Sequence, residues 1–415
     1  MPRMRMRKAW ALIGAVALAP VAHAEPLSFT EAVARAAAES PVTEARAHAV
    51  RAAERSVGPA GQLPDPNLVL GAANVPIEGP DAYRLDRDFM TMRSIGIMQE
   101  MPSGAERRAR RAMARADLAR AEAGLEIGRL DARLGAARAW INRYYAERRL
   151  DVLQDIASEA RAGAEAARAR LAGGAGGVDA AIEAELEAAR IEDQVADAHA
   201  AVTAARAELR RWIGEAAEET LDPAPPQFAL NSDELRARLA AHPALAAYAA
   251  EIAGAEADLR MARAERMPDW SWSLMYQNRD DAFGDMASVE VRIGLPLFQP
   301  WRQGPLIEAR RADRERVAAE RRASEREYAA SLDAALAEHA AAGANLERAR
   351  ETRLPLARQR AEAAAGAFAA GAMTAPELIA ARRAALEAEM DVIDLEERRA
   401  LIGASLTLQF AETGP

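Results

Sequence analysis

The sequence predicts a mainly α-helical fold with a small β part, in which one structural unit occurs twice. Three observations lead to this fold class. Two stretches repeat the same order of phrases, two very long segments are rich in helix formers, and four short phrases alternate apolar with polar residues. The first unit covers residues 25–220, the second covers residues 232–410, and a Pro-rich linker, residues 221–231, separates them.

The first element, residues 1–24, has the pattern of an export signal. A basic stretch is followed by an apolar run shorter than the roughly 20 residues that span a bilayer, and then by Ala22-His23-Ala24, a small-x-small cleavage site. We therefore expect the mature chain to start at Glu25, with no transmembrane helix after it. The chain has no Cys, which excludes disulfides, thiolate metal sites and a lipidated N-terminal Cys.

The mature chain is acidic. The signal takes four of the 54 Lys and Arg residues, and the remaining 50 face 63 Asp and Glu residues, a formal charge of about −13. This balance argues against nucleic acid as a partner.

Each unit opens with a short capped helix. Ser28 with Glu31, and Asn231 with Glu234, have the spacing of a capping box, in which the cap side chain and the carboxylate each accept a hydrogen bond from the other's backbone N–H. Each helix runs to a Pro, and a second helix rich in Ala, Glu and Arg follows it.

Two strands follow in each unit, at residues 66–75 and 92–101 in the first and at 269–278 and 288–297 in the second. The second unit has the clearer alternation, with apolar side chains at every second position of "WSWSLMYQ". Strands of about 9 to 11 residues with aromatic ends and one apolar face are typical of transmembrane β-strands. The expected lipid-facing belt consists of Trp270, Trp272 and Tyr276.

The other face of the strands would line a lumen, and the polar loops at 76–91 and 279–287 would face the exterior. Glu290 and Arg292 fall on the lumenal side, where they either tune selectivity or form an ordinary hydrated lining. Four Met residues share that parity. Thioethers suit Cu(I) or Ag(I), but Met also fills irregular packing, so a lumenal metal path and plain packing both stay open. These residues are Met90, Met92, Met98 and Met275.

Four strands cannot close a barrel, because single-chain barrels begin at about eight strands. Open strand edges are excluded from lipid, since their backbone groups would lack partners. A membrane role therefore requires an oligomer, and three chains would supply twelve strands. The alternative is a pair of soluble hairpins that pack on helices.

Each unit continues into a long α-hairpin, at residues 104–213 and 304–410. The rising helix of the first hairpin would be on the order of 100 Å long at ~1.5 Å per residue. Gly residues permit a tight reversal at each tip, and Thr374 with Glu377 has the spacing of a capping box that restarts the second return helix. The tip glycines are Gly173, Gly174, Gly176, Gly177 and Gly371.

The phrases "LPDP", "MPDW", "QEMPSGAERR", "GLPLF" and "AGAFAAGAMTAPELIAARRAALEAEM", in this order, resemble the TolC family of outer-membrane efflux proteins over Leu27 to Leu408. "QEMP-x-G-x-x-RR" is most similar to the outer-membrane components of heavy-metal resistance-nodulation-division (RND) exporters. The resemblance implies a homotrimer with a twelve-stranded barrel in the outer membrane and a twelve-helix tunnel in the periplasm. It also implies that the tips dock onto a periplasmic adaptor (a membrane fusion protein) and an inner-membrane RND pump.

By the same resemblance, the tips also form a gate that closes the tunnel. A gate needs side chains that pair and separate with little loss of free energy, which suits exposed ion pairs. The alternative is that these charges only solvate a helix face, and Glu377 is already explained as a cap. The candidates near the tips are Arg168, Arg170, Asp179, Glu183, Arg360, Glu377 and Arg382.

No motif in the sequence supports an enzyme or a cofactor site. The five His residues are scattered, without the i, i+4 pair of a helical metal site, and no nucleophile elbow, phosphate loop or paired-carboxylate motif stands out. The leading hypothesis is a passive exit duct of a tripartite pump for metal cations. The alternatives are a duct of the same fold for drugs or secreted polypeptides, and a soluble periplasmic adaptor.

Overall fold

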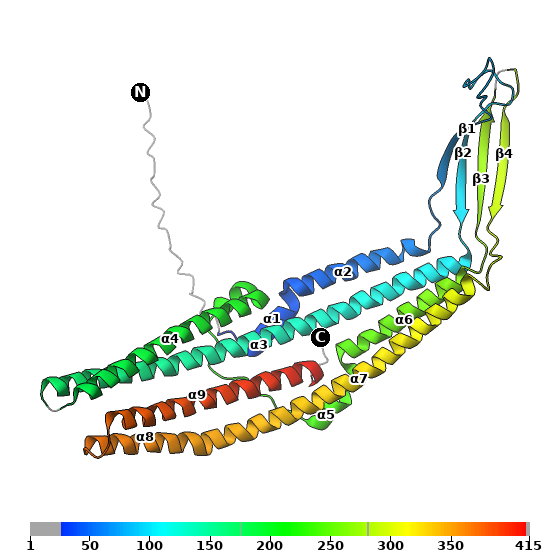
Figure 1. Ribbon diagram of the computed structural model, residues 1–415. Helices are drawn as coiled ribbons and strands as arrows, with labels where there is room; N and C mark the ends of the chain where they lie inside the picture. Colours follow the sequence, from blue (N-terminus) through cyan, green and yellow to red (C-terminus); the bar gives the residue numbers. More distant parts are fainter. Residues whose placement is uncertain (1–25, 175, 280–281, 412–415) are drawn as a thin grey trace, which may run out of the picture.

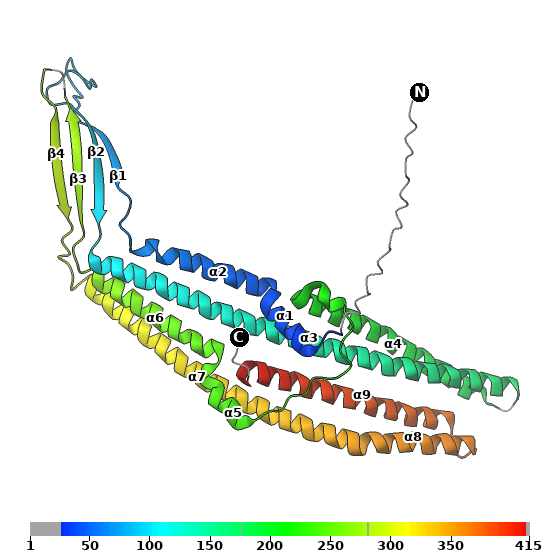
Figure 2. The ribbon, with the colours of Figure 1, turned by 180° about the vertical axis from the view of Figure 1, so that it is seen from behind.

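The computed structural model describes residues 26–174, 176–279 and 282–411, and the expected export signal lies outside these ranges. The described chain forms a long helical body with a small upright sheet at one end (Figure 1). The two turns of the long hairpins lie together at the other end of the body, as both ribbon views show (Figures 1 and 2). The molecule therefore has two distinct ends, one built from strands and one from helix turns.

The first unit contains one very long helix that shorter helices cover in succession. The helix α3 (Gly104–Ala172) packs against α2 (Pro41–Val57) along the part near the sheet and against α4 (Val178–Ile213) toward the tip. Ahead of α2 lies α1 (Phe29–Glu39), and the strands β1 (Asn67–Ala73) and β2 (Met92–Met101) precede α3. Two short 3₁₀ helices are η1 (Pro59–Gly61) and η2 (Gly214–Glu218).

The second unit repeats this order, which confirms the predicted duplication. It runs through α5 (Ser232–Arg238), η3 (Leu239–Ala241), α6 (Pro243–Ala264), β3 (Trp270–Asn278), β4 (Met286–Ile293) and α7 (Gln303–Arg348). It ends with η4 (Ala349–Arg353), α8 (Leu354–Ala369), α9 (Ala375–Leu406) and η5 (Thr407–Ala411). As α2 does on α3, α6 covers the sheet-proximal part of α7, and α8 and α9 form the second hairpin.

The rising helix of the second hairpin, predicted at residues 304–410, is not continuous. A π-helical turn, η4, separates α7 from α8 directly ahead of Pro355. Proline has no N–H to donate and its ring clashes with the carbonyl four residues earlier, so a regular α-helical turn cannot continue through this position.

Two of the expected capping boxes form only in half. The Ser28 hydroxyl accepts the N–H of Glu31 at 3.2 Å, and the Asn231 side chain accepts that of Asp233 at 3.1 Å. The two carboxylates do not return the bond but pair with arginines one turn further on, Glu31 with Arg35 and Glu234 with Arg238. An i, i+4 ion pair competes with the cap for the same carboxylate.

The four strands form one antiparallel sheet in the order β1-β2-β3-β4. The last strand is displaced from the predicted range, because it begins at Met286 and ends at Ile293 rather than extending to residue 297. The Gly294 N–H donates to the Asp269 carbonyl at 2.8 Å just beyond the last pair, and the ladder does not continue past Pro296, which has no N–H.

The main core lies where α1, α3, α4 and α9 meet, at the middle of the helical body. Trp140 is completely buried there, and its indole N–H donates to the Leu27 carbonyl at 3.1 Å. The ring stacks on Tyr144 at 5.4 Å and meets Phe29 edge-on at 5.7 Å. This core fixes the start of the first unit against both hairpins.

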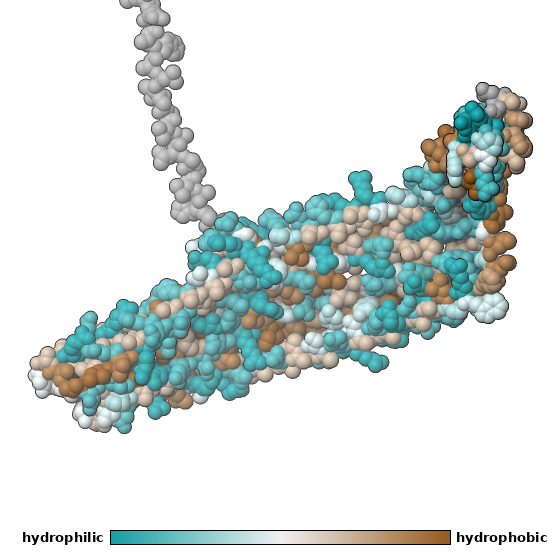
Figure 3. Space-filling model, turned by 45° about the horizontal axis from the view of Figure 1, so that its top comes forward, coloured by the Kyte–Doolittle hydropathy of each residue, from teal (hydrophilic) through white to brown (hydrophobic). Residues whose placement is uncertain are grey.

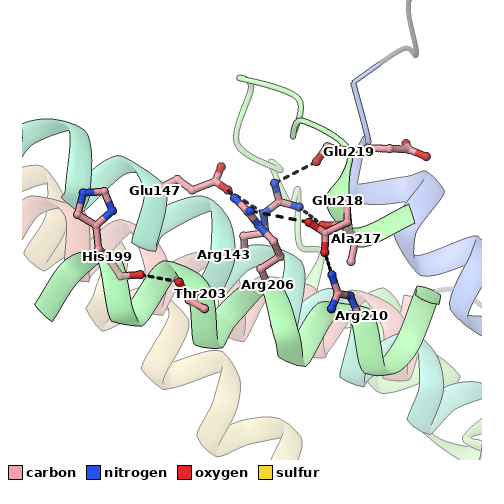
Figure 4. A network of polar contacts seen from close by, with 9 residues as sticks. All are labelled: Arg143, Glu147, His199, Thr203, Arg206, Arg210, Ala217, Glu218 and Glu219. Atoms are coloured by element: carbon pink, nitrogen blue, oxygen red, sulfur yellow. Dashed lines mark hydrogen bonds and ion pairs between the residues drawn. The ribbon is translucent and has the colours of Figure 1, made fainter. Parts of the chain in front are cut away.

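A buried arginine on α3 ties η2 and the residue after it, Glu219, to this core (Figure 4). The guanidinium of Arg143, 2% exposed, donates to the carbonyls of Ala217 at 2.7 Å and Glu219 at 3.0 Å, and to the Glu147 carboxylate at 2.7 Å. Arg206 and Arg210 of α4 pair with Glu218 beside it. One planar donor group thus satisfies three acceptors.

Candidate functional site

The sheet presents one continuous apolar face across all four strands. Residues directly opposite in an antiparallel ladder point to the same side, so the register places the apolar positions of every strand together. Most of these side chains are exposed in the single chain, Val289 at 74% and Leu70 at 68%. The face consists of Leu68, Leu70, Ile95, Ile97, Trp270, Trp272, Leu274, Tyr276, Val289, Val291 and Ile293. Each of the three predicted belt aromatics lies on it.

The opposite face is polar and carries both expected lumen charges. Glu290 pairs with Ser273 across the ladder, Arg292 pairs with Ser271, and the two charged side chains bind each other at 2.9 Å. Because the pair is exposed and internally neutralised, it adds little net charge to this face.

The four methionines do not form one row. Met98 and Met275 lie on the polar face, and the Met275 side chain covers Gly96, where an added Cβ would come within 2.7 Å of its Cγ. Met92 begins β2 on the same side. Met90 lies before β2, in the loop, where the parity of a strand does not apply.

Both outer strands of the sheet have a free edge. In the described chain, β1 pairs only with β2 and β4 pairs only with β3. A free edge leaves a row of backbone N–H and C=O groups without partners, which is a template for pairing with another strand. The sheet is therefore incomplete as a single chain.

The first hairpin turns between the end of α3 and the start of α4, where the structure describes Gly173, Gly174, Gly176 and Gly177. Gly174 has a left-handed backbone, φ 73°, which favours glycine, and Gly176 lies so close to the end of α3 that an added Cβ would be 3.2 Å from the Leu171 nitrogen. Gly173 and Gly177 have ordinary negative φ and serve as the C-cap of α3 and the N-cap of α4. Asp179 lies in the first turn of α4, where the helix dipole favours a negative charge.

The second hairpin turns at Gly371, which also has a left-handed backbone at φ 75°. Thr374 caps α9, and Glu377 accepts its N–H at 2.9 Å. These hydrogen bonds, first the backbone and then the hydroxyl, lower the pKa of Glu377 below its ordinary value. The Glu377 carboxylate is thus already hydrogen-bonded within its own turn.

The remaining predicted gate charges divide between the two hairpins. Arg168 pairs with Glu185 at 2.8 Å inside the first hairpin. Arg170 reaches across to the second, where its guanidinium lies 5.9 Å from the centre of the Phe368 ring, and Arg382 lies against α3 beside Gly163. Glu183 is half-buried and Arg360 is exposed.

Sequence reasoning missed the most direct link between the two hairpins. Arg383 of α9 binds Glu187 of α4 at 2.5 Å, and the Glu187 side chain is only 15% exposed. The attraction of Glu187 raises the pKa of Arg383 above its ordinary value. The sequence did contain a hint of this pair. Glu187 and Arg383 each follow the tip of their own hairpin by about the same number of residues, and two hairpins whose tips lie together bring such residues to the same height.

A second link, nearer the core, was also missed. Glu396 of α9 is 6% exposed and pairs with Arg148 of α3 and with Arg350 of η4. The π-helical turn that carries Arg350 lies against α9. Burial of Tyr145, and then the negative charge of Glu396, raise the pKa of Tyr145 to about 12. A buried carboxylate with two arginines is costly to break, so this link is firmer than the one at the tips.

Within the described ranges no group of three or more His, Cys, Asp or Glu side chains is arranged to hold a metal ion. In the same part of the chain no helix has the length and apolarity to cross a membrane.

Comparison with known proteins agrees with this architecture. The family model for outer membrane efflux proteins matches residues 235–410. The cobalt-zinc-cadmium resistance protein CzcC of Cupriavidus metallidurans is 28% identical over 378 residues, covering 89% of this chain and 87% of that protein.

Solved structures share the fold over nearly the whole chain. CusC superposes with a TM-score of 0.73 at 15% identity, covering 91% of each chain. The CmeC outer membrane channel of Campylobacter jejuni gives 0.72 at 13% identity, covering 99% of this chain and 94% of that one. The repeated unit, the sheet and the long hairpins thus have the fold of solved outer membrane channels, and residues 235–410 match the family of outer membrane efflux proteins.

Proposed function

We propose that three copies of this chain form a passive exit duct through the outer membrane, with a twelve-stranded barrel above a tunnel of twelve long helices. The observation that carries the proposal is the sheet, which has one apolar and one polar face and two free edges. Three such sheets joined edge to edge satisfy every edge, turn the apolar faces to lipid and enclose the polar faces.

The helical end would serve as the periplasmic end of the duct. The two tips lie side by side at the end of the body farthest from the sheet (Figure 1). We propose that they contact a periplasmic adaptor and that an RND pump of the inner membrane supplies the energy, since the chain itself offers no motif for nucleotide hydrolysis. The Glu187–Arg383 and Arg170–Phe368 contacts would hold the two hairpins together in the resting state.

Heavy-metal cations are the proposed substrates. The support is that CzcC, whose name assigns it to cobalt, zinc and cadmium resistance, aligns with most of this chain. No metal site is needed for such a role, because a duct conducts an ion without holding it.

Localisation and assembly test the proposal. The mature chain is expected in the outer-membrane fraction, non-lipidated, and as a trimer after extraction in mild detergent. Recovery as a soluble monomer would contradict both the barrel and the duct.

Gene deletion tests the substrate. Loss of the chain should raise sensitivity to Co, Zn, Cd, Cu or Ag salts and leave sensitivity to drugs unchanged. Sensitivity to drugs alone would instead assign the same duct to a drug exporter.

A further inference from the structure

The segment between β4 and α7 exposes more apolar surface than its place in a loop explains. We call residues 294–302, "GLPLFQPWR", the junction segment. Leu295, Leu297, Phe298 and Trp301 are each between 67% and 78% exposed, so four large apolar side chains face outward within seven residues. Exposed apolar groups in such density mark a surface that contacts something other than water.

Several backbone N–H groups of the junction segment need no hydrogen bond to water. The N–H of Leu297 bonds to the Leu295 carbonyl at 2.9 Å, and the N–H groups of Trp301 and Arg302 both bond to the Phe298 carbonyl, at 3.1 and 2.9 Å. Pro296 and Pro300 carry no N–H at all. These bonds and the two prolines reduce the number of donors that need water, which lowers the cost of entering an apolar environment.

The junction segment also extends the apolar face of the sheet. It follows Ile293, the last residue of β4 on that face, and in Figure 3 the apolar surface continues from the sheet down to its junction with the helices. A neighbouring copy would pair with the edge of β4, in the plane of the sheet, whereas apolar side chains that continue a face project away from that plane.

The height of the sheet supports the same conclusion. The apolar positions of β3 run from Trp270 to Tyr276, ~20 Å along the strand, which is ~16 Å along the membrane normal at a tilt of ~40°. The lipid-facing band of a membrane barrel is ~25 Å tall. At the loop end Tyr276 bonds to the Asp285 carboxylate, and at the helix end the junction segment adds apolar height to the face.

Basic side chains flank the apolar groups. Arg302 directly follows Trp301, and Arg266, whose carbonyl accepts a hydrogen bond from Gln299, is exposed nearby. Aromatic and basic residues side by side are typical of the boundary between acyl chains and phosphate headgroups.

We propose that the junction segment is an interfacial anchor that binds phospholipid at the periplasmic boundary of the outer membrane. This inference rests on the proposed function in one respect, namely that the sheet spans the membrane. It adds that the lipid-facing surface does not end with the strands, and that Leu297 and Trp301 lie in the headgroup region of the inner leaflet.

The absence of Cys makes the test direct, because each single-Cys variant carries one label. We would label Leu297→Cys and Trp301→Cys with an environment-sensitive fluorophore in the full mature protein. The protein would be reconstituted in nanodiscs of phosphatidylethanolamine and phosphatidylglycerol. Quenching by nitroxide-labelled phospholipid would be compared with quenching by aqueous iodide. Val289→Cys, in the middle of β4, and Ala319→Cys, exposed on α7, are the matched controls.

We expect the labels at 297 and 301 to behave like the label at 289, with lipid quenching at least about twofold above that at 319 and correspondingly weak iodide quenching. Lipid contact at 289 together with iodide contact at 297 and 301 would overturn the anchor and leave the duct intact. Protection of 297 and 301 from both quenchers would assign them to a neighbouring copy and equally overturn it. If lipid does not quench the label at 289 either, the sheet does not face the membrane, and the result contradicts the proposed function itself.

Discussion

At the scale of single residues, the buried arginine Arg143 shows how one side chain stabilises the joint between the first unit and the linker. Its guanidinium, itself buried, donates to two backbone carbonyls and one carboxylate. We predict that Arg143→Met costs about 1–3 kcal/mol per chain, because the buried Ala217 carbonyl loses its donor and the two part-buried acceptors lose theirs. This loss of stability is measured as a lower midpoint of thermal unfolding, followed by circular dichroism. The control Arg311→Met, which removes an exposed pair with Glu308, should leave the midpoint nearly unchanged.

His242 makes the stability of the second unit depend on pH. Its ring caps α6 by accepting the N–H of Ala244 at 3.2 Å, and it packs against Tyr328 at 4.3 Å. Burial lowers the pKa of His242 below its ordinary value of 6.5, so the unfolded chain takes up this proton at higher pH than the folded chain. Its contribution is therefore complete above pH 6.5 and is lost as the pH falls through the lowered pKa.

We predict that the unfolding temperature drops between pH 7 and pH 5, and that His242→Asn, which keeps a capping side chain, reduces this slope. His339, whose pKa is also lowered, first by burial and then by Arg399, accounts for part of the remaining slope. An unchanged slope in the variant would show that His242 does not contribute.

At the scale of elements, the link between α4 and α9 decides how easily the two hairpins separate. Glu187→Gln removes the charge that holds Arg383. The Arg383 side chain is 44% exposed, and ion pairs that solvent screens in this way contribute up to about 1 kcal/mol, a factor of about five in a population. We predict a rise of up to about fivefold in the open probability of the reconstituted trimer, measured as conductance across a planar bilayer.

The matched control for this link is Glu185→Gln, which breaks a pair with Arg168 inside one hairpin. Its conductance should equal that of the parent protein. An equal rise in both variants would mean that any charge loss near the tip has this effect, and the specific link would then be wrong.

The elements themselves were predictable to the extent that each has a local cause. Alternation in "WSWSLMYQ" specified a strand and the parity of its apolar face, and the long stretches without Pro specified the hairpins. The interruption at η4 had a visible cause in Pro355, but the start of β4 at Met286 depends on its pairing with Gln277 of β3, a contact between two strands. Sequence patterns do not contain such a contact.

The candidate site was less predictable than the fold for the same reason. Gly174, Gly371 and the Thr374 cap follow from local turn chemistry, and the structure places them at the tips. The contacts between hairpins, Glu187 with Arg383 and Glu396 with Arg148, join residues far apart in the chain. Charges are so frequent on these helices that their number gives no hint of which pairs meet.

At the scale of the whole molecule, the free edges of β1 and β4 are the feature that a single chain cannot resolve. The two edges are three strand spacings apart in one chain, ~14 Å, which is too far for a short cross-link between them. An edge-to-edge assembly instead brings β4 of one copy beside β1 of the next.

The most direct test of this assembly is cross-linking between the edges in outer-membrane vesicles. A chain carrying both Leu70→Cys on β1 and Val289→Cys on β4 has no other thiol, so a short bis-maleimide joins only these two positions. We predict a ladder of covalently linked chains on a denaturing gel, in which the largest species contains three chains. Monomers alone, or a ladder that continues past three, would contradict the closed twelve-stranded barrel.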